Sequence, residues 1–251
     1  MTTQYTLTGE LSSEKTKSFI SALTNIAKSG IEKIILEFSK EHELAIHACN
    51  NVSSIFCDVT FDKCLLDGFE IKDNVQYAIS DLNDVLGLLN IFKQSGFKLE
   101  ICPEKMTISS NDNFLEYFGA DPRRIKKSEM GDIEYIPKLC TFTCDETFTE
   151  FLNAINKISH ENVLVSGKQG EDSISVSIAH KNQEGNSFTR KLKTEYTTTF
   201  KVILDKIHVG KILEVGSQII IREPIVNVHK SFELYNLSYS IAPVTPEKGV
   251  N

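Results

Sequence analysis

Cysteine and histidine are the residue types in this sequence that could bind a metal ion or act as nucleophiles. Cys140 and Cys144 could share one face of a strand, and His160 follows a predicted helix, so the three side chains could share a zinc ion. The chain contains six cysteines, but no two of them have the C-x-x-C spacing, and a fourth zinc ligand is missing. We therefore predict no metal, no cofactor and no disulfide, and keep a small zinc or thiol enzyme as a lesser alternative.

Motifs for enzymatic phosphate or acyl chemistry are absent as well. Gly167-Lys168-Gln169 resembles the end of a P-loop but lacks the following Ser or Thr and the glycine spacing. The sequence contains neither H-E-x-x-H nor G-x-S-x-G, and His42 and His47 are not spaced as a metal-binding pair. The sequence therefore predicts a protein that is not an enzyme and has no catalytic residues.

The lysines form a more consistent pattern, because they recur on the outward positions of four predicted helices. In each helix acidic residues stand near the start, and the later outward positions are neutral or basic. Lysines on long stems can contact backbone phosphates without reading bases, so this pattern predicts non-specific binding of double-stranded DNA. The alternative is that late lysines only complement the helix dipole. The candidate DNA-binding residues are Lys15, Lys17, Lys28, Lys93, Lys157, Lys206 and Lys211.

Most of the chain that must position these lysines is strand-like. The segments FKLEIC, SISVSIA and NLSYSIA alternate apolar and polar residues, which is typical of antiparallel sheets with one buried face. Four segments instead show the apolar spacing of a helix, with caps at Ser12 or Ser13 and at Ser80, and with Gly30 and Gly96 as stops. The predicted helices span residues 12–29, 80–95, 146–159 and 205–213.

The order of these elements repeats once along the chain. Each half reads as strand, helix, several strands, helix, several strands, and LAIHACN corresponds in this alignment to VSIAHKN. An internal repeat of about half the chain length indicates two similar domains. We predict an α+β fold with a first domain over residues 1–121, a connector over 122–137 and a second domain over 138–251.

Composition limits the remaining classes of protein. The chain has 251 residues, 41% of them hydrophobic, and no apolar run long enough to cross a membrane or resemble a signal peptide, so a soluble cytoplasmic protein is expected. The net charge of −7 argues against a simple basic DNA-binding domain. It is compatible with a protein that keeps its positive charge on one face.

Two segments carry a family resemblance. AISDLNDVLGLLNIF, at 78–92, and FGADP, at 118–122, resemble the corresponding segments of the DNA sliding clamps of T-even-type tailed bacteriophages. The tail YSIAPVTPEKGV is similar to the end of the cellular clamp, proliferating cell nuclear antigen. The resemblance at the level of residues is confined to about 77–122 and to this tail, whereas the length, the repeat and the four helices fit over the whole chain.

The resemblance implies a fold and a function. Each domain would place a curved antiparallel sheet outside and two helices inside, and three chains would join head to tail into a homotrimeric ring. The ring would encircle duplex DNA and tether a DNA polymerase for processive viral DNA replication. An ATP-driven clamp loader would open it, late-transcription factors could be further partners, and the location would be the bacterial host cytoplasm. Alternatives are an accessory factor that forms no ring and a β-rich structural protein that does not bind DNA.

The resemblance also implies a partner pocket beside the connector and the C-terminal segment. Its candidate residues are Ile133, Tyr135, Ile136, Pro137, Ile241, Ala242 and Pro243. Short apolar tails of replication proteins would bind there, although Tyr135 could equally belong to the core. Two basic segments, RRIKK at 123–127 and TRKLK at 189–193, are either solvated surface or contacts for DNA, a loader or an acidic tail.

Overall fold

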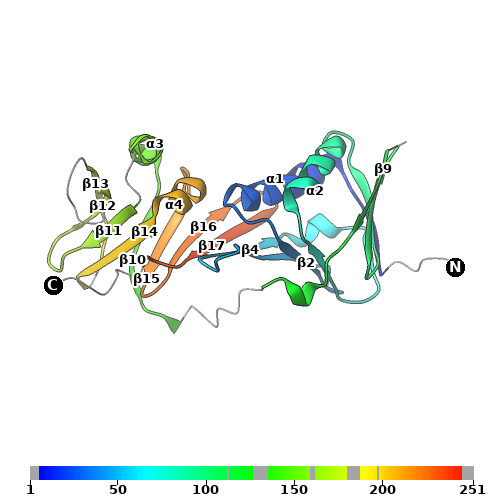
Figure 1. The fold of residues 1–251 in the computed structure, drawn as a ribbon, viewed down its shortest axis with the longest axis horizontal. Helices are drawn as coiled ribbons and strands as arrows, with labels where there is room; N and C mark the ends of the chain where they lie inside the picture. The colour runs from blue at the N-terminus through cyan, green and yellow to red at the C-terminus, as the bar shows by residue number, and fades with distance from the viewer. Residues whose placement is uncertain are drawn as a thin grey trace. The chain divides into compact units, whose positions relative to one another are not determined.

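The structure is a computed structural model of the chain. It describes residues 6–111, 113–126, 135–158, 162–179, 187–196 and 198–244, without the side chains of Asn156 and Ala179. The chain divides into two compact units (Figure 1). The N-terminal unit contains Met1–Glu129 and Ser231–Ser238, and the C-terminal unit contains Met130–Lys230 and Tyr239–Asn251. Among the described residues, no helix has the length and apolar character needed to span a membrane.

The N-terminal unit is built from antiparallel strands and two helices. Its elements are β1 (Leu7–Leu11), α1 (Ser13–Lys28), β2 (Ile34–Phe38), β3 (Leu44–Cys49), β4 (Ile55–Phe61), β5 (Glu70–Ile71), β6 (Val75–Ile79), α2 (Leu82–Leu89), β7 (Phe97–Ile101), β8 (Lys105–Ser110) and β9 (Asn113–Phe118), with short 3-10 turns at Lys63–Leu66, Asn90–Phe92 and Pro122–Arg124. One sheet has the order β5-β1-β7-β8-β9, and β9 forms its edge. The other strands follow the order β6-β2-β3-β4.

The C-terminal unit repeats this sequence of elements. It contains β10 (Lys138–Thr143), a 3-10 turn (Glu146–Phe148), α3 (Thr149–Lys157), β11 (Asn162–Gly167), β12 (Ser173–Ala179), β13 (Phe188–Lys193), β14 (Phe200–Asp205), α4 (Lys206–Ile212), β15 (Gln218–Arg222), β16 (Val226–Ser231) and β17 (Tyr235–Ile241). One sheet has the order β13-β12-β11-β14, and the other strands follow β10-β15-β16-β17. Strand β17 begins in the N-terminal unit, where it lies beside β4, and ends in the C-terminal unit. The predicted α+β fold with antiparallel sheets is confirmed.

Helix α1 forms where the sequence predicts it. The Ser12 side chain accepts a hydrogen bond from the Lys15 amide, and Phe19, Leu23 and Ile26 are buried along one face. Gly30 follows the helix with a φ of 87°, a conformation that glycine adopts without steric cost. The helix is fixed to the start of β17, because Ser21 and Asn25 both reach the Tyr235 hydroxyl at 3.0 Å.

Helix α2 is shorter than predicted. Asp81 caps it by accepting a hydrogen bond from the Asp84 amide, and Leu82, Val85, Leu86 and Leu89 are buried. The predicted span of 80–95 then tightens into the 3-10 turn Asn90–Phe92. The chain leaves the helix at Gly96, which has a φ of 73°, and a Cβ there would lie 2.5 Å from the Leu11 carbonyl oxygen on β1, so the position requires glycine.

The helices of the C-terminal unit have weaker local signals. Helix α3 begins without a side-chain cap, after the 3-10 turn that buries Phe148. Asp205 caps α4 by accepting from the amides of Ile207 and His208. In this helix Ile207 is 61% exposed, whereas Val209 and Ile212 are buried.

Candidate nucleic-acid interface and partner site

Helices α1 and α2 lie side by side in the N-terminal unit (Figure 1). On α1 the outward residues Lys17, Ser21 and Lys28 are exposed, and the one outward acid, Glu14, belongs to the first turn. The predicted distribution of charge is therefore present on this helix. Lys15 is partly buried, which leaves its ammonium group less free to reach a ligand than that of Lys17 or Lys28.

The outward face of α2 is less basic than the sequence suggested. Its exposed positions include Asn83, Gly87 and the apolar residues Leu88 and Ile91, of which Ile91 is 62% exposed. Lys93 is exposed directly after the 3-10 turn and carries the positive charge at this end. Unlike a fully basic surface, this face would hold a polyanion loosely.

In the C-terminal unit, α3 and α4 pack against each other and carry three of the candidate lysines. Lys157 and Lys211 are exposed near the ends of their helices. Lys206 differs, because its ammonium group donates a hydrogen bond to the carbonyl of Ile158, the residue that ends α3. This contact satisfies one carbonyl at the C-terminal end of α3, so Lys206 already has a structural partner.

The acidic residues in the first turns of these helices either lie near a basic residue or complement the helix dipole. Glu150, in the first turn of α3, lies 3.9 Å from the Arg190 guanidinium on β13. Glu14 and Asp84 are exposed in the first turns of α1 and α2, where a negative charge complements the helix dipole. Beyond these first turns, the described outward residues of α1 and α2 are neutral or basic.

The candidate partner residues separate into surface and core. Ile133 lies outside the described residues. Tyr135 is 84% exposed, so its alternative assignment to the core is wrong, while Pro137 and Ala242 are exposed and Ile136 and Pro243 are partly covered.

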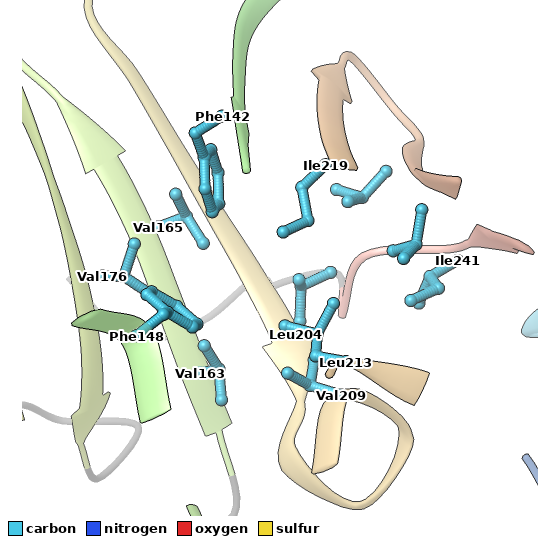
Figure 2. A pocket seen from close by; sticks show the side chains of 12 residues that line it. Phe142, Phe148, Val163, Val165, Val176, Leu204, Val209, Leu213, Ile219 and Ile241 are labelled. Carbon is cyan, nitrogen blue, oxygen red and sulfur yellow. The ribbon is translucent and has the colours of Figure 1, made fainter. Parts of the chain in front are cut away.

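Ile241 does not belong to this surface. It is 1% exposed and points into the core of the C-terminal unit, where a small cavity of about 10 Å³ lies between the sheets and α4 (Figure 2). All of the cavity lining is apolar: Phe142, Phe148, Val163, Val165, Val176, Leu204, Val209, Leu213, Ile219, Val226, Val228 and Ile241. A lining without polar groups leaves the cavity dry, so it is a packing defect of the core.

Two of the basic residues at 123–127 have specific partners. Arg123 donates hydrogen bonds to both carboxylate oxygens of Asp121, and Lys126 donates to the Ser53 hydroxyl at 3.1 Å. Between them Ile125 is buried against Ile35 and Ala78. The start of the connector is therefore docked on the N-terminal unit. Lys127 lies outside the described residues.

The sequence analysis missed a second group of charged residues in the C-terminal unit. Arg222 is 6% exposed, its Nη1 donates a hydrogen bond to the Ile136 carbonyl, and its buried Nε has no hydrogen-bond partner. Lys138 pairs with Arg222 in the β10–β15 ladder. The one signal in the sequence is a charged residue directly after the apolar run of β15, which a strand end explains equally well.

Cys140 and Cys144, the two cysteines considered as zinc ligands, are buried free thiols. Burial raises the pKa of Cys140 and of Cys144 to about 12, so both remain protonated and unreactive near neutral pH. His160, the third candidate zinc ligand, lies outside the described residues. Within the described part of the chain, no group of three or more His, Cys, Asp or Glu side chains is arranged to hold a metal ion.

No protein-family model matches the sequence, and no curated protein sequence matches it. Solved structures with the same fold include proliferating cell nuclear antigen (PCNA) of A. fulgidus bound to the C-terminal region of FEN-1, with a TM-score of 0.72, 12% identity and coverage of 96% of this chain and 100% of that chain. PCNA of Entamoeba histolytica has a TM-score of 0.72 at 11% identity and the same coverage. The PCNA2–PCNA3 complex of Sulfolobus tokodaii gives 0.69 at 13% identity, covering 94% of this chain and 98% of that chain. The chain therefore has the fold of the PCNA-type sliding clamps.

Proposed function

We propose that this protein is a DNA sliding clamp of the T-even phage type, which encircles duplex DNA and tethers a replicative polymerase. The support is the clamp fold over nearly the whole chain, together with lysines on the outward faces of its helices. Such a protein needs no catalytic group, because topology rather than affinity keeps it on DNA. An ATP-driven loader would open the ring, and late-transcription factors would be further partners in the bacterial host cytoplasm.

The observation that carries the proposal is a pair of open sheet edges. Strand β9 has the place in the N-terminal unit that β17 has in the C-terminal unit, and β13 likewise corresponds to β4. Strand β17 lies beside β4 in the sheet order, whereas β9 and β13 each end a sheet. An open edge invites pairing with another chain. Pairing β9 of one copy with β13 of the next repeats the β17–β4 junction and gives a head-to-tail contact, which closes into a ring.

The side chains on these two edges support that pairing. On one face of β9, Phe114 and Phe118 are 65% and 69% exposed, with Glu116 between them. The corresponding face of β13 exposes Thr189, Lys191 and Lys193. Long lysine stems can cover the exposed aromatic rings of β9. Glu116, which already pairs with Lys105 of its own chain, adds a negative charge between these rings, so the two faces are complementary. Three copies would complete the homotrimer.

Partner binding is proposed on the opposite side from the helices. PCNA of A. fulgidus binds the C-terminal region of FEN-1. In this chain the exposed residues Tyr135, Pro137 and Ala242 provide an apolar surface for a short segment of a polymerase. Ile136 and Pro243 border that surface, and Ile241 supports it from the core.

The decisive experiment separates topological binding from ordinary binding. We expect light scattering to give three times the chain mass of 28.2 kDa, and loaded protein to stay on nicked circular DNA but slide off linear DNA. The triple variant Lys17→Glu, Lys28→Glu and Lys93→Glu should keep the trimer but lose polymerase stimulation, because it reverses the charge that meets phosphate.

The matched control reverses the same number of charges away from the helices, at Lys72, Lys168 and Lys201, which are all exposed. It should retain both trimer and stimulation. A monomer that still stimulates the polymerase would favour the accessory factor without a ring. A protein that neither binds DNA nor stimulates synthesis would favour a structural role.

A further inference from the structure

The guanidinium group of Arg222 is almost fully buried. Arg222 is 6% exposed, and its Nε atom has neither solvent nor a hydrogen-bond acceptor. Nη1 donates to the Ile136 carbonyl, which ties β15 to the end of the connector but supplies no negative charge. Among the described residues no carboxylate forms an ion pair with Arg222, and the neighbouring Glu223 is exposed. A buried, always charged group in this state lacks the partner that such groups normally have.

The strand register places Arg222 beside a second cation and near the proposed partner surface. Lys138, which is exposed, stands opposite Arg222 on β10, and Arg222 exchanges backbone hydrogen bonds with Ile225 on the other side. Asn227 donates to the Ser240 hydroxyl across β16 and β17. Continuing this antiparallel register by two residues brings Ala242 opposite Ile225, so Lys138, Arg222 and Ala242 lie in one row across the sheet.

This row lies on the face of the sheet that points away from the helices. Ile219, Val228 and Ile241 point into the core cavity between the sheets and α4 (Figure 2). Ile220 alternates with Ile219 and pairs with Asn227, so both occupy the opposite face. Arg222 stands two residues beyond Ile220 and shares that face. A partner that contacts Ala242 on this face would therefore meet Arg222 about two strand spacings away, roughly 10 Å.

His229 lies in the electrostatic field of the same two cations. His229 is half-buried on β16, and its pKa is lowered by burial and by the charges of Arg222 and Lys138. The ring therefore senses the charges of both cations. An anion bound beside Arg222 would reverse this effect and raise the pKa of His229.

We propose that Arg222 and Lys138 form a carboxylate-binding site that anchors an acidic residue or the terminal carboxylate of a partner peptide docked on Ala242 and Tyr135. This deepens the proposed function, on which it rests, by giving the partner segment a required charge next to its apolar residues. A guanidinium offers paired donors in the geometry of a carboxylate, and Lys138 adds a flexible second charge at the surface.

The test uses the full-length trimer and two short fluorescein-labelled peptides. One contains phenylalanines flanked by aspartates and ends in a free carboxylate; the other replaces aspartate with asparagine and ends in an amide. The wild-type protein should bind the acidic peptide about tenfold more tightly or better, as expected for a charge-assisted contact. Arg222→Gln should abolish this preference, Lys138→Gln should reduce it, and Lys72→Gln, at an exposed lysine of the N-terminal unit, should keep it.

The alternative is that Arg222 only fixes the connector through Ile136. In that case Arg222→Gln would weaken both peptides equally, or the wild-type protein would show no preference, and either result would overturn the proposal. Titration of His229 by NMR gives a second readout, because its pKa should rise with the acidic peptide and stay unchanged with the neutral one. Trapping on circular DNA without any peptide preference would reject this site alone, whereas loss of trapping would reject the clamp itself.

Discussion

At the scale of single residues, the partner of a charged side chain decides what that side chain can do. Lys211 and Lys206 belong to the same short helix, yet Lys211 is exposed while Lys206 caps the end of α3. Arg123 and Arg222 show the reverse contrast. The exposed Arg123 is paired with Asp121, whereas the buried Arg222 has no ion pair with any acid that the structure describes. Residue type alone would have assigned the same role to Lys206 and Lys211, and likewise to Arg123 and Arg222.

His229 provides a prediction at this scale. Its folded-state pKa lies below the ordinary value of 6.5, because burial and the nearby cations disfavour the charged ring. As the pH falls through 6.5, the unfolded chain binds a proton before the folded chain does, so the free energy of unfolding should decrease. Urea denaturation from about pH 7.5 to about pH 5 should show this loss, and His229→Gln should make the dependence shallower. His42→Gln, in the other unit, is the control; an unchanged slope in the His229 variant would contradict the assignment.

At the scale of elements, α2 shows how a buried stripe and a solvent-facing glycine coexist. Leu82, Val85 and Leu89 fasten the helix, while Gly87 faces outward with nothing within 4 Å of a Cβ built on it. No packing in the N-terminal unit requires a glycine there. Its cost in helix stability is therefore uncompensated within this unit.

Gly87→Ala should stabilise the protein by about 0.5–1 kcal/mol, because alanine loses less backbone entropy in a helix. Gly9→Ala makes the matched comparison on β1, where the added Cβ would lie 2.3 Å from the Phe69 ring, and this variant should unfold at a lower urea concentration. Urea denaturation of both variants measures whether each substitution raises or lowers the free energy of unfolding. Destabilisation by Gly87→Ala would show that the helix is packed at this position by something other than solvent.

At the scale of the whole molecule, the sheet edges decide how copies associate. Each unit buries its own core, but β9 remains an edge strand with exposed aromatic rings. In a monomer the unpaired backbone groups of such an edge promote aggregation, whereas in a closed ring they pair with the next chain. The proposed trimer uses it to join β9 to β13.

Phe114→Lys combined with Phe118→Lys should convert the trimer to monomers, since lysines would then face Lys191 and Lys193 across the junction. Both side chains are already exposed, so the fold of each chain should survive. Val52→Lys, at a residue that is 75% exposed on the β3–β4 turn, is the matched control and should stay trimeric. Light scattering distinguishes the two, and a trimer that survives the double substitution would place the junction elsewhere.

Local physics let the sequence determine the elements of this protein. Apolar spacing, the cap at Ser12 and the stops at Gly30 and Gly96 act within a few residues, so they predicted all four helices and the repeated α+β order. The predicted cap at Ser80 was wrong by one residue, because Asp81 caps α2. Only the tertiary structure decided that Ile241 faces the core, that Lys206 caps α3 and that the Nε atom of Arg222 is buried without an acceptor among the described residues. These outcomes depend on which strands and helix ends meet across long stretches of chain. Periodicity assigns a residue to a face but does not say what lies opposite it.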